Sequence, residues 1–204
     1  NIVCTNSYTV KINGDSKNIS NTNELLGRME GIYGVKTGFT NGANRCLVTS
    51  VKRGNLDIIT VVLGADTKKF RTEDSVKLIN YAFNNYEDID VKKQLEEEFE
   101  RWRQQNEDKI YINKGKKQNI DVMLQENDNY YITVRKTQKE DINFNVNSLY
   151  LLKAPVQKNQ LIGNLCVKVG EEEKLVVNIV NKKTIKKRKV FDYMKIFITK
   201  ISHF

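Results

Sequence analysis

The chain has 204 residues, of which 39% are hydrophobic and 29% charged, and its formal net charge is +9. This length suffices for one large or two small domains with a buried core, and the composition excludes wholesale disorder. The longest apolar run, residues 58–63, is far too short to span a bilayer. With a single histidine, His203, and three cysteines, the chain cannot form a Ser-His-Asp triad, a Cys-His dyad or a Cys/His zinc cage.

The cysteines give no sign of a disulfide framework, and the first residue suggests a processed N-terminus. Cys4, Cys46 and Cys166 are odd in number and show no C-x-x-C spacing, so we predict three buried small hydrophobic side chains without a disulfide framework. The chain opens at Asn1 without a methionine or a targeting segment, and we expect a processing or artificial boundary there, with further sequence upstream.

The positive charge is concentrated at the C-terminus. Residues 182–204 contain eight lysines and arginines and a single acidic residue, Asp192, so this segment carries most of the net charge. A domain that binds duplex nucleic acid would spread its cations over a folded face. We therefore expect no nucleic-acid partner, and the C-terminal segment requires another explanation.

Residues 1–88 predict an antiparallel sheet with one helix. Strands at 8–12 and 17–19 flank Asn13-Gly14, which supplies the positive φ angles of a tight hairpin. Further strands are expected at residues 35–40, 45–52 and 56–64. The last is nearly continuous in β-branched residues, which favours a central strand covered on both faces.

A helix follows these strands. Thr72, Asp74 and Ser75 are candidate capping residues at its start. Beyond them, apolar residues recur mostly at helical spacing, which predicts that one side of the helix lies against the sheet; they are Val76, Ile79, Tyr81 and Phe83.

Residues 89–108 are highly charged and predict an amphipathic helix that links two domains. Its apolar stripe consists of Val91, Leu95, Phe99 and Trp102. From residue 109 to 181, short alternating segments separated by turn-prone residues predict a small β-sandwich, with Pro155 between two strands. The segments are 109–113, 118–124, 129–135, 141–146, 149–152, 160–169 and 174–180.

Residues 182–204 predict an amphipathic helix with a cationic lead-in. Its apolar stripe and the flanking apolar positions are Val190, Phe191, Met194, Phe197, Ile198, Ile201 and Phe204. An apolar face beside many lysines suits the surface of an anionic membrane, on which the helix lies without crossing. The alternative is a helix that docks on the protein's own core.

The tripeptide Lys36-Thr37-Gly38 opens a predicted strand. Taken alone it is a weak signal, because an exposed Lys and Thr at a strand start are common. The same tripeptide is, however, the third motif of penicillin-binding proteins and class A β-lactamases. Residues 34–40, read together with the strands and the helix that follow, resemble the serine-type D-alanyl-D-alanine carboxypeptidases, which are low-molecular-weight penicillin-binding proteins.

The resemblance extends over nearly the whole chain. Asn21-Thr22-Asn23 is similar to the family's lead-in to the Lys-Thr-Gly strand, and Ala154-Pro155-Val156 is similar to a turn of its C-terminal β-domain. Asn159 stands where the family usually has glycine, a mild change because Asn tolerates left-handed geometry. The resemblance implies an α+β fold: part of a transpeptidase-like catalytic domain (1–88), a helical linker (89–108), a β-sandwich (109–181) and an amphipathic membrane anchor (182–204).

The resemblance also implies a role for each matched residue. Lys36 would place a fixed cation beside the substrate's terminal carboxylate, and Thr37 would donate a hydrogen bond to it. Gly38 would let the strand pass close to the nucleophile, and Phe39 would contribute its backbone N–H to an oxyanion hole. Arg71 would face the carboxylate end of the substrate, although an ordinary surface cation is an equally good interpretation.

One family motif is missing. Family members acylate the serine of Ser-x-x-Lys, whereas Ser7, Ser16, Ser20, Ser50, Ser75 and Ser148 all lack a lysine at the third following position. Ser16-Lys17-Asn18 spells the family's Ser-x-Asn motif, but its place in the predicted hairpin indicates a coincidence. We therefore expect the C-terminal portion of a longer enzyme, inactive by itself.

For the intact protein, the resemblance implies removal of the terminal D-alanine from peptidoglycan stem peptides. It further implies inhibition by β-lactams, no metal or organic cofactor, and peripheral attachment to the extracytoplasmic face of the cell membrane. Three alternatives stay open: a β-lactamase or endopeptidase on the same fold, a catalytically dead membrane-bound protein that binds or scaffolds the cell wall, and, more distantly, a nucleic-acid binder.

Overall fold

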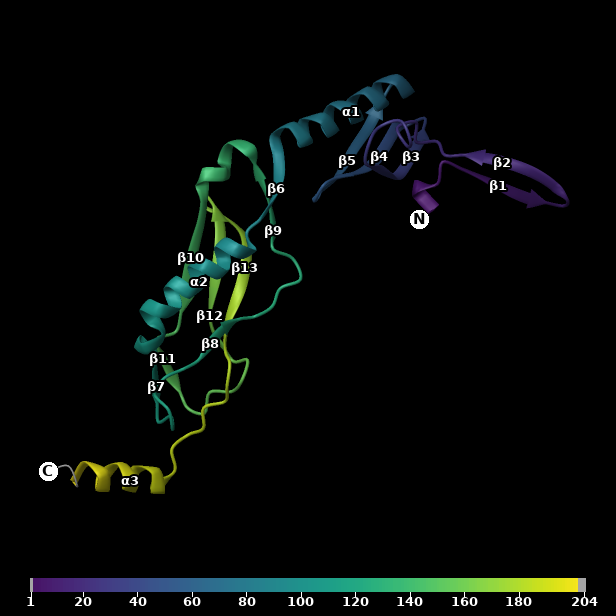
Figure 1. Ribbon diagram of the computed structural model, residues 1–204. Helices are drawn as coiled ribbons and strands as arrows, with labels where there is room; N and C mark the ends of the chain where they lie inside the picture. Colours follow the sequence, from purple (N-terminus) through teal and green to yellow (C-terminus); the bar gives the residue numbers. More distant parts are fainter. Residues whose placement is uncertain (1, 202–204) are drawn as a thin grey trace. The chain divides into compact units, whose positions relative to one another are not determined.

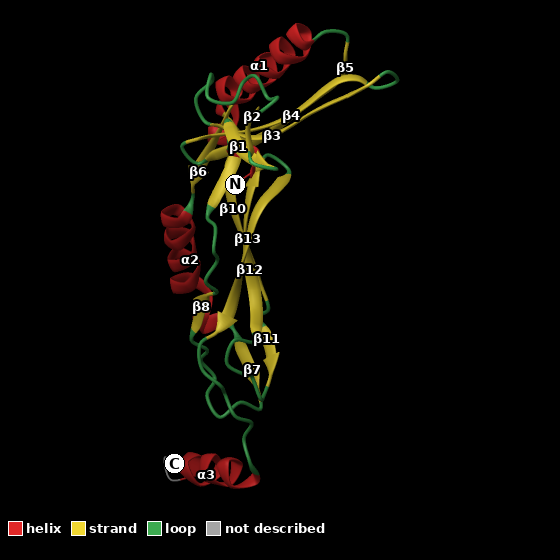
Figure 2. Cartoon of the chain, turned by 90° about the vertical axis from the view of Figure 1, so that its right-hand side faces the viewer, coloured by secondary structure: helices red, strands yellow, loops and turns green. Residues whose placement is uncertain are grey.

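The computed structural model describes residues 2–201 and divides into two compact units (Figures 1 and 2). The first unit comprises residues 1–88 and 133–137, and the second comprises residues 89–132 and 138–204. The α+β class expected from the sequence is confirmed, with antiparallel sheets, packed helices and a C-terminal helix. The four domain limits expected from the sequence stay predictions.

The chain begins with the short 3-10 helix η1 (Ile2–Cys4) and the predicted hairpin. Its strands are β1 (Ser7–Ile12) and β2 (Asp15–Ser20), paired antiparallel. Asn13 and Gly14 at the turn have φ angles of 51° and 91°. Both residue types tolerate the left-handed conformation, so the Asn-Gly signal correctly predicted this turn.

The sheet of the first unit has the order β3 (Ile32–Thr40), β4 (Asn44–Arg53), β5 (Leu56–Ala65). Among the described residues β4 is therefore the central strand, and the prediction that residues 56–64 form a central, doubly covered strand was wrong. On β5, Ile59, Val61 and Leu63 are 68%, 52% and 70% exposed. A continuous β-branched run favours a strand, but it does not show whether both faces are covered.

Helix α1 (Lys68–Asn85) covers the other face of this sheet, where it contacts β4 and β5 (Figure 1). It begins earlier than predicted, because Thr67 is the N-cap and its side chain accepts a hydrogen bond from the Phe70 N–H at 3.1 Å. The predicted capping residues, Thr72, Asp74 and Ser75, lie inside the helix.

The core of the first unit lies between α1 and the sheet. Its buried members are Leu25, Leu47, Val51 and Ile79, with Met29, Ile32, Ile58, Val76 and Phe83 packed around them. Tyr81, which the sequence also placed against the sheet, is 54% exposed. Gly31, directly before β3, has a φ angle of 82°, and a Cβ there would lie 2.3 Å from the Lys52 carbonyl oxygen, so this position requires glycine.

The predicted apolar stripe of α2 (Lys92–Asn106) is confirmed. Val91, Leu95, Phe99 and Trp102 are all buried. The helix belongs to the second unit and contacts β10 and β12 of its sheet, whereas the sequence placed it between two domains. Burial of one face explains why a helix this charged is stable.

The second unit contains a β-sandwich, as predicted. Its larger sheet has the order β10 (Ile142–Ser148), β12 (Leu161–Val169), β13 (Glu172–Asn181), β8 (Val122–Leu124). A second, parallel pair consists of β7 (Tyr111–Asn113) and β11 (Leu151–Lys153). The predicted strand 129–135 corresponds to β9 (Tyr131–Arg135), which pairs instead with β6 (Tyr86–Asp90). The remaining elements are the 3-10 helices η2 (Glu107–Lys109) and η3 (Lys136–Asp141).

Two details of the second unit agree with the sequence, and the cysteines agree only in part. Pro155 lies between β11 and β12, and Asn159 has a φ angle of 62°, which asparagine tolerates. Cys166 is buried, whereas Cys46 is half-buried and Cys4 is exposed. The prediction of three buried cysteines was therefore wrong for the two in the first unit.

The chain ends in α3 (Val190–Ile201). Five of the predicted membrane-facing residues are more than half exposed: Val190, Phe191, Met194, Phe197 and Ile198. Ile201 is the last residue of the helix, and Phe204 lies outside the described residues. Within residues 2–201, no helix combines the length and the apolar character needed to cross a bilayer.

Candidate functional site

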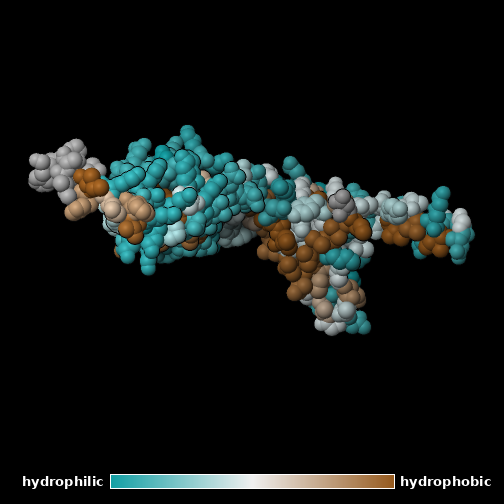
Figure 3. All heavy atoms as spheres, turned by 90° about the horizontal axis from the view of Figure 1, so that it is seen from below, coloured by the Kyte–Doolittle hydropathy of each residue, from teal (hydrophilic) through white to brown (hydrophobic). Residues whose placement is uncertain are grey.

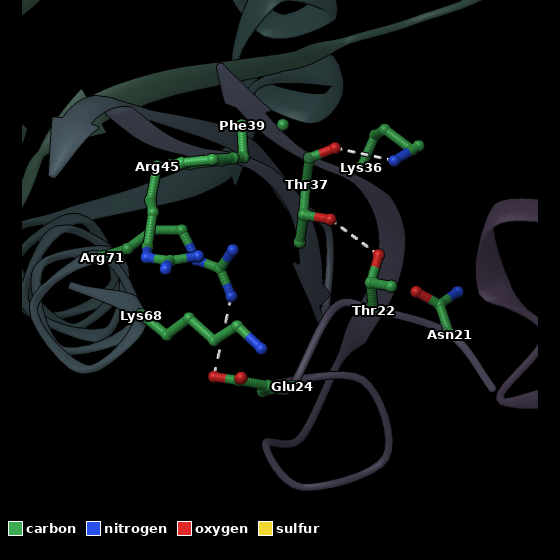
Figure 4. Close-up of a pocket in the computed structure, with 10 residues that line it drawn as sticks. Asn21, Thr22, Glu24, Lys36, Thr37, Phe39, Arg45, Lys68 and Arg71 are labelled. Atoms are coloured by element: carbon green, nitrogen blue, oxygen red, sulfur yellow. Dashed lines mark hydrogen bonds and ion pairs between the residues drawn. The ribbon is translucent and has the colours of Figure 1, made fainter. Parts of the chain in front are cut away.

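All five predicted binding residues of the first unit line one pocket of about 420 Å³ (Figure 4). β3 contributes Lys36, Thr37, Gly38 and Phe39, and the first turns of α1 contribute Arg71. The full lining consists of Asn21, Thr22, Glu24, Lys36, Thr37, Gly38, Phe39, Arg45, Lys68 and Arg71. Residues far apart in the sequence thus form one site.

Two asparagines hold the loop that forms one wall. The Asn21 side chain donates to the carbonyl oxygens of Val3 and Thr5 at 3.2 and 3.1 Å, and its oxygen accepts from the Asn23 backbone N–H at 2.9 Å. The buried Asn23 side chain donates to the Gly34 carbonyl at 3.1 Å. Asn21 thus fastens the loop to residues 3–5 and Asn23 fastens it to β3, which explains the Asn-Thr-Asn sequence.

Thr22, between the two asparagines, meets the Lys-Thr-Gly strand. Its Oγ1 lies 2.6 Å from the Thr37 Oγ1, and either hydroxyl can be the donor. The Lys36 ammonium donates to the Thr37 carbonyl oxygen at 2.7 Å. One exposed ammonium and two hydroxyls therefore lie together at this wall (Figure 4).

Arg71 forms an ion pair with Glu24, an acidic residue of the loop. Its guanidinium is 3.6 Å from the Glu24 carboxylate, and Glu24 also accepts from the Thr72 hydroxyl at 2.9 Å. Arg71 is only 4% exposed, and within residues 2–201 its Nε has no hydrogen-bond partner. A buried guanidinium with an unused donor favours an anionic ligand, and an ordinary surface cation does not fit this burial.

Phe39 and Arg45, which are paired across β3 and β4, also line the pocket. The Arg45 guanidinium lies 4.8 Å from the centroid of the Phe39 ring, a cation–π contact that orients both side chains. Gly38 pairs with Cys46, and a Cβ at Gly38 would make only ordinary contact, at 3.6 Å. Packing against β4 therefore does not explain why residue 38 is glycine. Because Gly38 lines the pocket, the absence of a side chain there leaves room for a ligand.

Sequence reasoning did not identify five residues as lining the pocket: Asn21, Thr22, Glu24, Arg45 and Lys68. Lys68 precedes Arg71 by one helical turn and would have been found if Thr67 had been identified as the cap. Arg45 follows from the register set by the turn between β3 and β4. With them, the lining has four cationic side chains and one carboxylate, a balance that favours an anionic ligand.

Other candidate groups lie outside this pocket. Ser16, Lys17 and Asn18 are exposed on β2 and are not among the lining residues. Among residues 2–201, no three or more His, Cys, Asp or Glu side chains are grouped so as to hold a metal ion.

Comparisons with known proteins agree with this geometry. The family model for D-alanyl-D-alanine carboxypeptidase matches residues 1–67, and the model for the C-terminal domain of penicillin-binding protein 5 matches residues 103–187. The chain is 32% identical over 178 residues to the D-alanyl-D-alanine carboxypeptidase DacF of Bacillus subtilis, covering 86% of this chain and 42% of DacF.

Solved structures show the same fold. Penicillin-binding protein 5 from Haemophilus influenzae superposes with a TM-score of 0.64 at 22% identity, covering 91% of this chain and 51% of that protein. The carboxypeptidase DacD from Francisella tularensis gives 0.54 at 26% identity, covering 85% and 41%. The chain thus spans about half or less of the relatives it matches. Its two family matches, its DacF likeness and its fold show that the chain belongs to the D-alanyl-D-alanine carboxypeptidase family and corresponds to a C-terminal portion of it.

Proposed function

We propose that this chain supplies the substrate-binding wall of a serine-type D-alanyl-D-alanine carboxypeptidase. The observation that carries the proposal is the gathering of Lys36, Thr37 and the buried Arg71 around one pocket. Three cationic or hydroxyl donors beside one another suit the terminal carboxylate of a stem peptide that ends in D-Ala-D-Ala. β-Lactams, whose carboxylate is placed similarly, would bind there as inhibitors.

In this proposal each residue acts on a defined part of the substrate. Lys36 and Arg71 offer positive charge to the carboxylate, and the Thr37 hydroxyl donates to it while the Thr22 hydroxyl donates to Thr37. The Phe39 backbone N–H is one donor to the oxyanion of the tetrahedral intermediate. Gly38 leaves room for the substrate beside the strand.

The nucleophile is expected from sequence outside this chain. In the intact protein a serine would attack the carbonyl of the D-Ala-D-Ala bond, and a neighbouring lysine would take its proton. The terminal D-alanine would leave as the amine, and water would then hydrolyse the acyl-enzyme. Since none of the six serines of residues 1–201 is followed by lysine at the third position, the chain by itself should not turn over substrate.

A labelling experiment with fluorescent penicillin tests this function. Membranes of the source organism are labelled, and an antibody to this chain identifies the band. We expect a labelled band much larger than 23.7 kDa. Thr37→Val in that protein should slow acylation about tenfold or more, because a hydrogen bond to a charged group is lost. Thr9→Val, at an exposed position of β1, is the matched control.

A second candidate function is a catalytically dead protein that binds or scaffolds the cell wall, in which the pocket of Lys36, Thr37 and Arg71 only binds its ligand. An unlabelled band at 23.7 kDa would support it and contradict the enzyme proposal. Hydrolysis of penicillin by the larger protein would instead favour a β-lactamase on the same fold.

We also propose that the chain attaches to the extracytoplasmic face of the cell membrane through α3. The exposed apolar residues of this helix and the cations that precede it support an anionic lipid surface as the partner. Deletion of residues 190–204 should abolish binding to vesicles of equal parts phosphatidylcholine and phosphatidylglycerol. Unchanged binding would contradict the anchor.

A further inference from the structure

The cationic segment before α3 is docked on the β-sandwich. Ile185 is 6% exposed and exchanges backbone hydrogen bonds with Val156 at 2.8 and 3.0 Å. The buried Asn181 side chain donates to the carbonyl oxygens of Gln157 and Lys183 at 3.0 and 2.6 Å. These contacts fix the backbone of residues 181–185 on the β-sandwich, and the cations at residues 186–189 follow directly after this fixed segment.

A basic loop of the sandwich lies beside this segment. The loop after β7 has the sequence Lys114-Gly115-Lys116-Lys117, and all three lysines are exposed. A Cβ on Gly115 would lie 2.7 Å from both the Ile112 side chain and the Lys117 carbonyl oxygen, so the tight turn requires glycine.

Backbone hydrogen bonds join the loop to the segment. The Lys116 N–H donates to the Lys186 carbonyl and the Arg188 N–H to the Lys114 carbonyl, both at 2.9 Å. We call the resulting set of seven cations the basic rim: Lys114, Lys116, Lys117, Lys186, Lys187, Arg188 and Lys189.

The rim is also connected to the first turn of α3. The Lys116 ammonium lies 3.1 Å from the Asp192 carboxylate, which accepts from the Lys189 backbone N–H at 2.7 Å. These two donors hold the pKa of Asp192 below its usual value. Arg188 lies 5.9 Å from the centroid of the Tyr193 ring. The exposed apolar residues of α3 therefore begin directly beside the rim.

Acidic groups at this end of the unit are few and already engaged. Asp192 contacts Lys116, and Asp121 lies within 4.0 Å of the ammonium groups of Lys182 and Lys183. The rim therefore keeps a strong positive charge, and beside it lie Val190 and Phe191, 74% and 75% exposed. Cations next to exposed apolar side chains match the two layers of an anionic bilayer surface, phosphates above acyl chains.

We propose that the Lys114–Lys117 loop of the β-sandwich binds lipid phosphates and seats the second unit on an anionic membrane while α3 inserts its apolar side. This rests on the proposed membrane attachment and adds a second contact to it, from the folded domain. A soluble polyanion would neutralise the rim but leave the apolar side of α3 in water, which makes it the weaker candidate.

The test compares two double variants of equal charge in the whole chain. Lys114→Gln/Lys117→Gln removes two rim cations, and Lys168→Gln/Lys174→Gln removes two cations near the β12–β13 turn, at the strand ends opposite Asn181. Binding to vesicles of equal parts phosphatidylcholine and phosphatidylglycerol is measured by sedimentation. Each cation near such a surface strengthens binding about fivefold, so the rim variant should bind at least about tenfold more weakly than the control.

The outcomes separate this proposal from the anchor. If deletion of residues 190–204 abolishes binding while the two double variants bind equally, the rim proposal is overturned and the anchor stands. If the rim variant alone binds weakly, and added salt removes the difference, the rim is supported. If soluble polyphosphate binds the chain and the rim variant loses that binding, while the two double variants bind vesicles equally, the partner is a soluble polyanion and the membrane proposal is overturned. Trp102 fluorescence confirms that each variant is folded.

Discussion

The two units differ in how completely their sheets are covered. In the second unit, α2 and the sandwich strands bury a large set of side chains, including Leu95, Ile162, Leu165 and Ile179, which are all fully buried. In the first unit, α1 covers one face of the sheet, while β5 exposes three large apolar side chains on the other. Figure 3 shows hydrophobic residues gathered on the visible face of the first unit.

This difference indicates that the larger buried core and the candidate binding site lie in different units. The second unit contains most of the buried apolar side chains of the described residues. The first unit contains the candidate site, whose wall is held by side-chain amides and an ion pair above a small core. An exposed apolar sheet face of this kind marks a surface that another segment or protein can cover.

Matched leucines give the largest expected contrast. Leu165→Ala empties space in the fully buried core of the second unit and should lower the free energy of unfolding by about 3 kcal/mol. Leu63→Ala, at a position that is 70% exposed on β5, should cost less than about 0.5 kcal/mol. Urea unfolding followed by circular dichroism measures both, and Trp102 fluorescence reports the second unit separately. Equal costs would show that the β5 face is buried in solution.

Alanine substitutions at two glycines, Gly163 in the second unit and Gly42 in the first, compare how closely the backbone is packed in the two units. A Cβ at Gly163 would lie 2.2 Å from the Asn147 carbonyl oxygen on the neighbouring strand, so Gly163→Ala should destabilise the second unit by roughly 2 kcal/mol or more. Gly42→Ala has no atom within 4 Å of the new Cβ and should be nearly neutral. Thermal unfolding compares the two. A neutral Gly163→Ala would contradict the close packing of β10 on β12.

The helix cap tests the smaller core of the first unit. Thr67→Ala removes the acceptor for the Phe70 N–H at the start of α1 and should cost about 1 kcal/mol. Thr67→Ser retains the hydroxyl and should recover most of this loss. Hydrogen exchange in α1 measures the effect locally, and unchanged exchange in the alanine variant would contradict the cap.

The smallest expected effect is a difference in how fast the cysteines of the two units react with a thiol reagent. Burial raises the pKa of the Cys166 thiol in the second unit, and the side chain is only 4% exposed, so it should react slowly with a thiol reagent. Cys46 and the exposed Cys4, in the first unit, should react faster. Mass spectrometry of the labelled peptides gives the order. Fast labelling of Cys166 would mean that the sandwich opens readily.

Local patterns predicted much of the fold because their physical causes are local. The Asn13-Gly14 turn, the stripe through Leu95 and Trp102, and the strands of the sandwich all follow from a turn geometry or a side-chain period that a short segment expresses. The cap at Thr67 was missed because several polar residues near a helix start are equally able to cap it. Only the backbone geometry selected one of them.

The sequence by itself determined the family resemblance, the Lys-Thr-Gly strand and the amphipathic character of the last helix, since each is written in neighbouring residues. The tertiary structure decided that β5 is an edge strand with one exposed face, that Arg71 is buried against Glu24, and that Thr22 meets Thr37. It also brought the Lys114–Lys117 loop beside the segment before α3. These contacts join residues far apart in the chain, and their positions depend on packing and strand register, which no short stretch of sequence specifies.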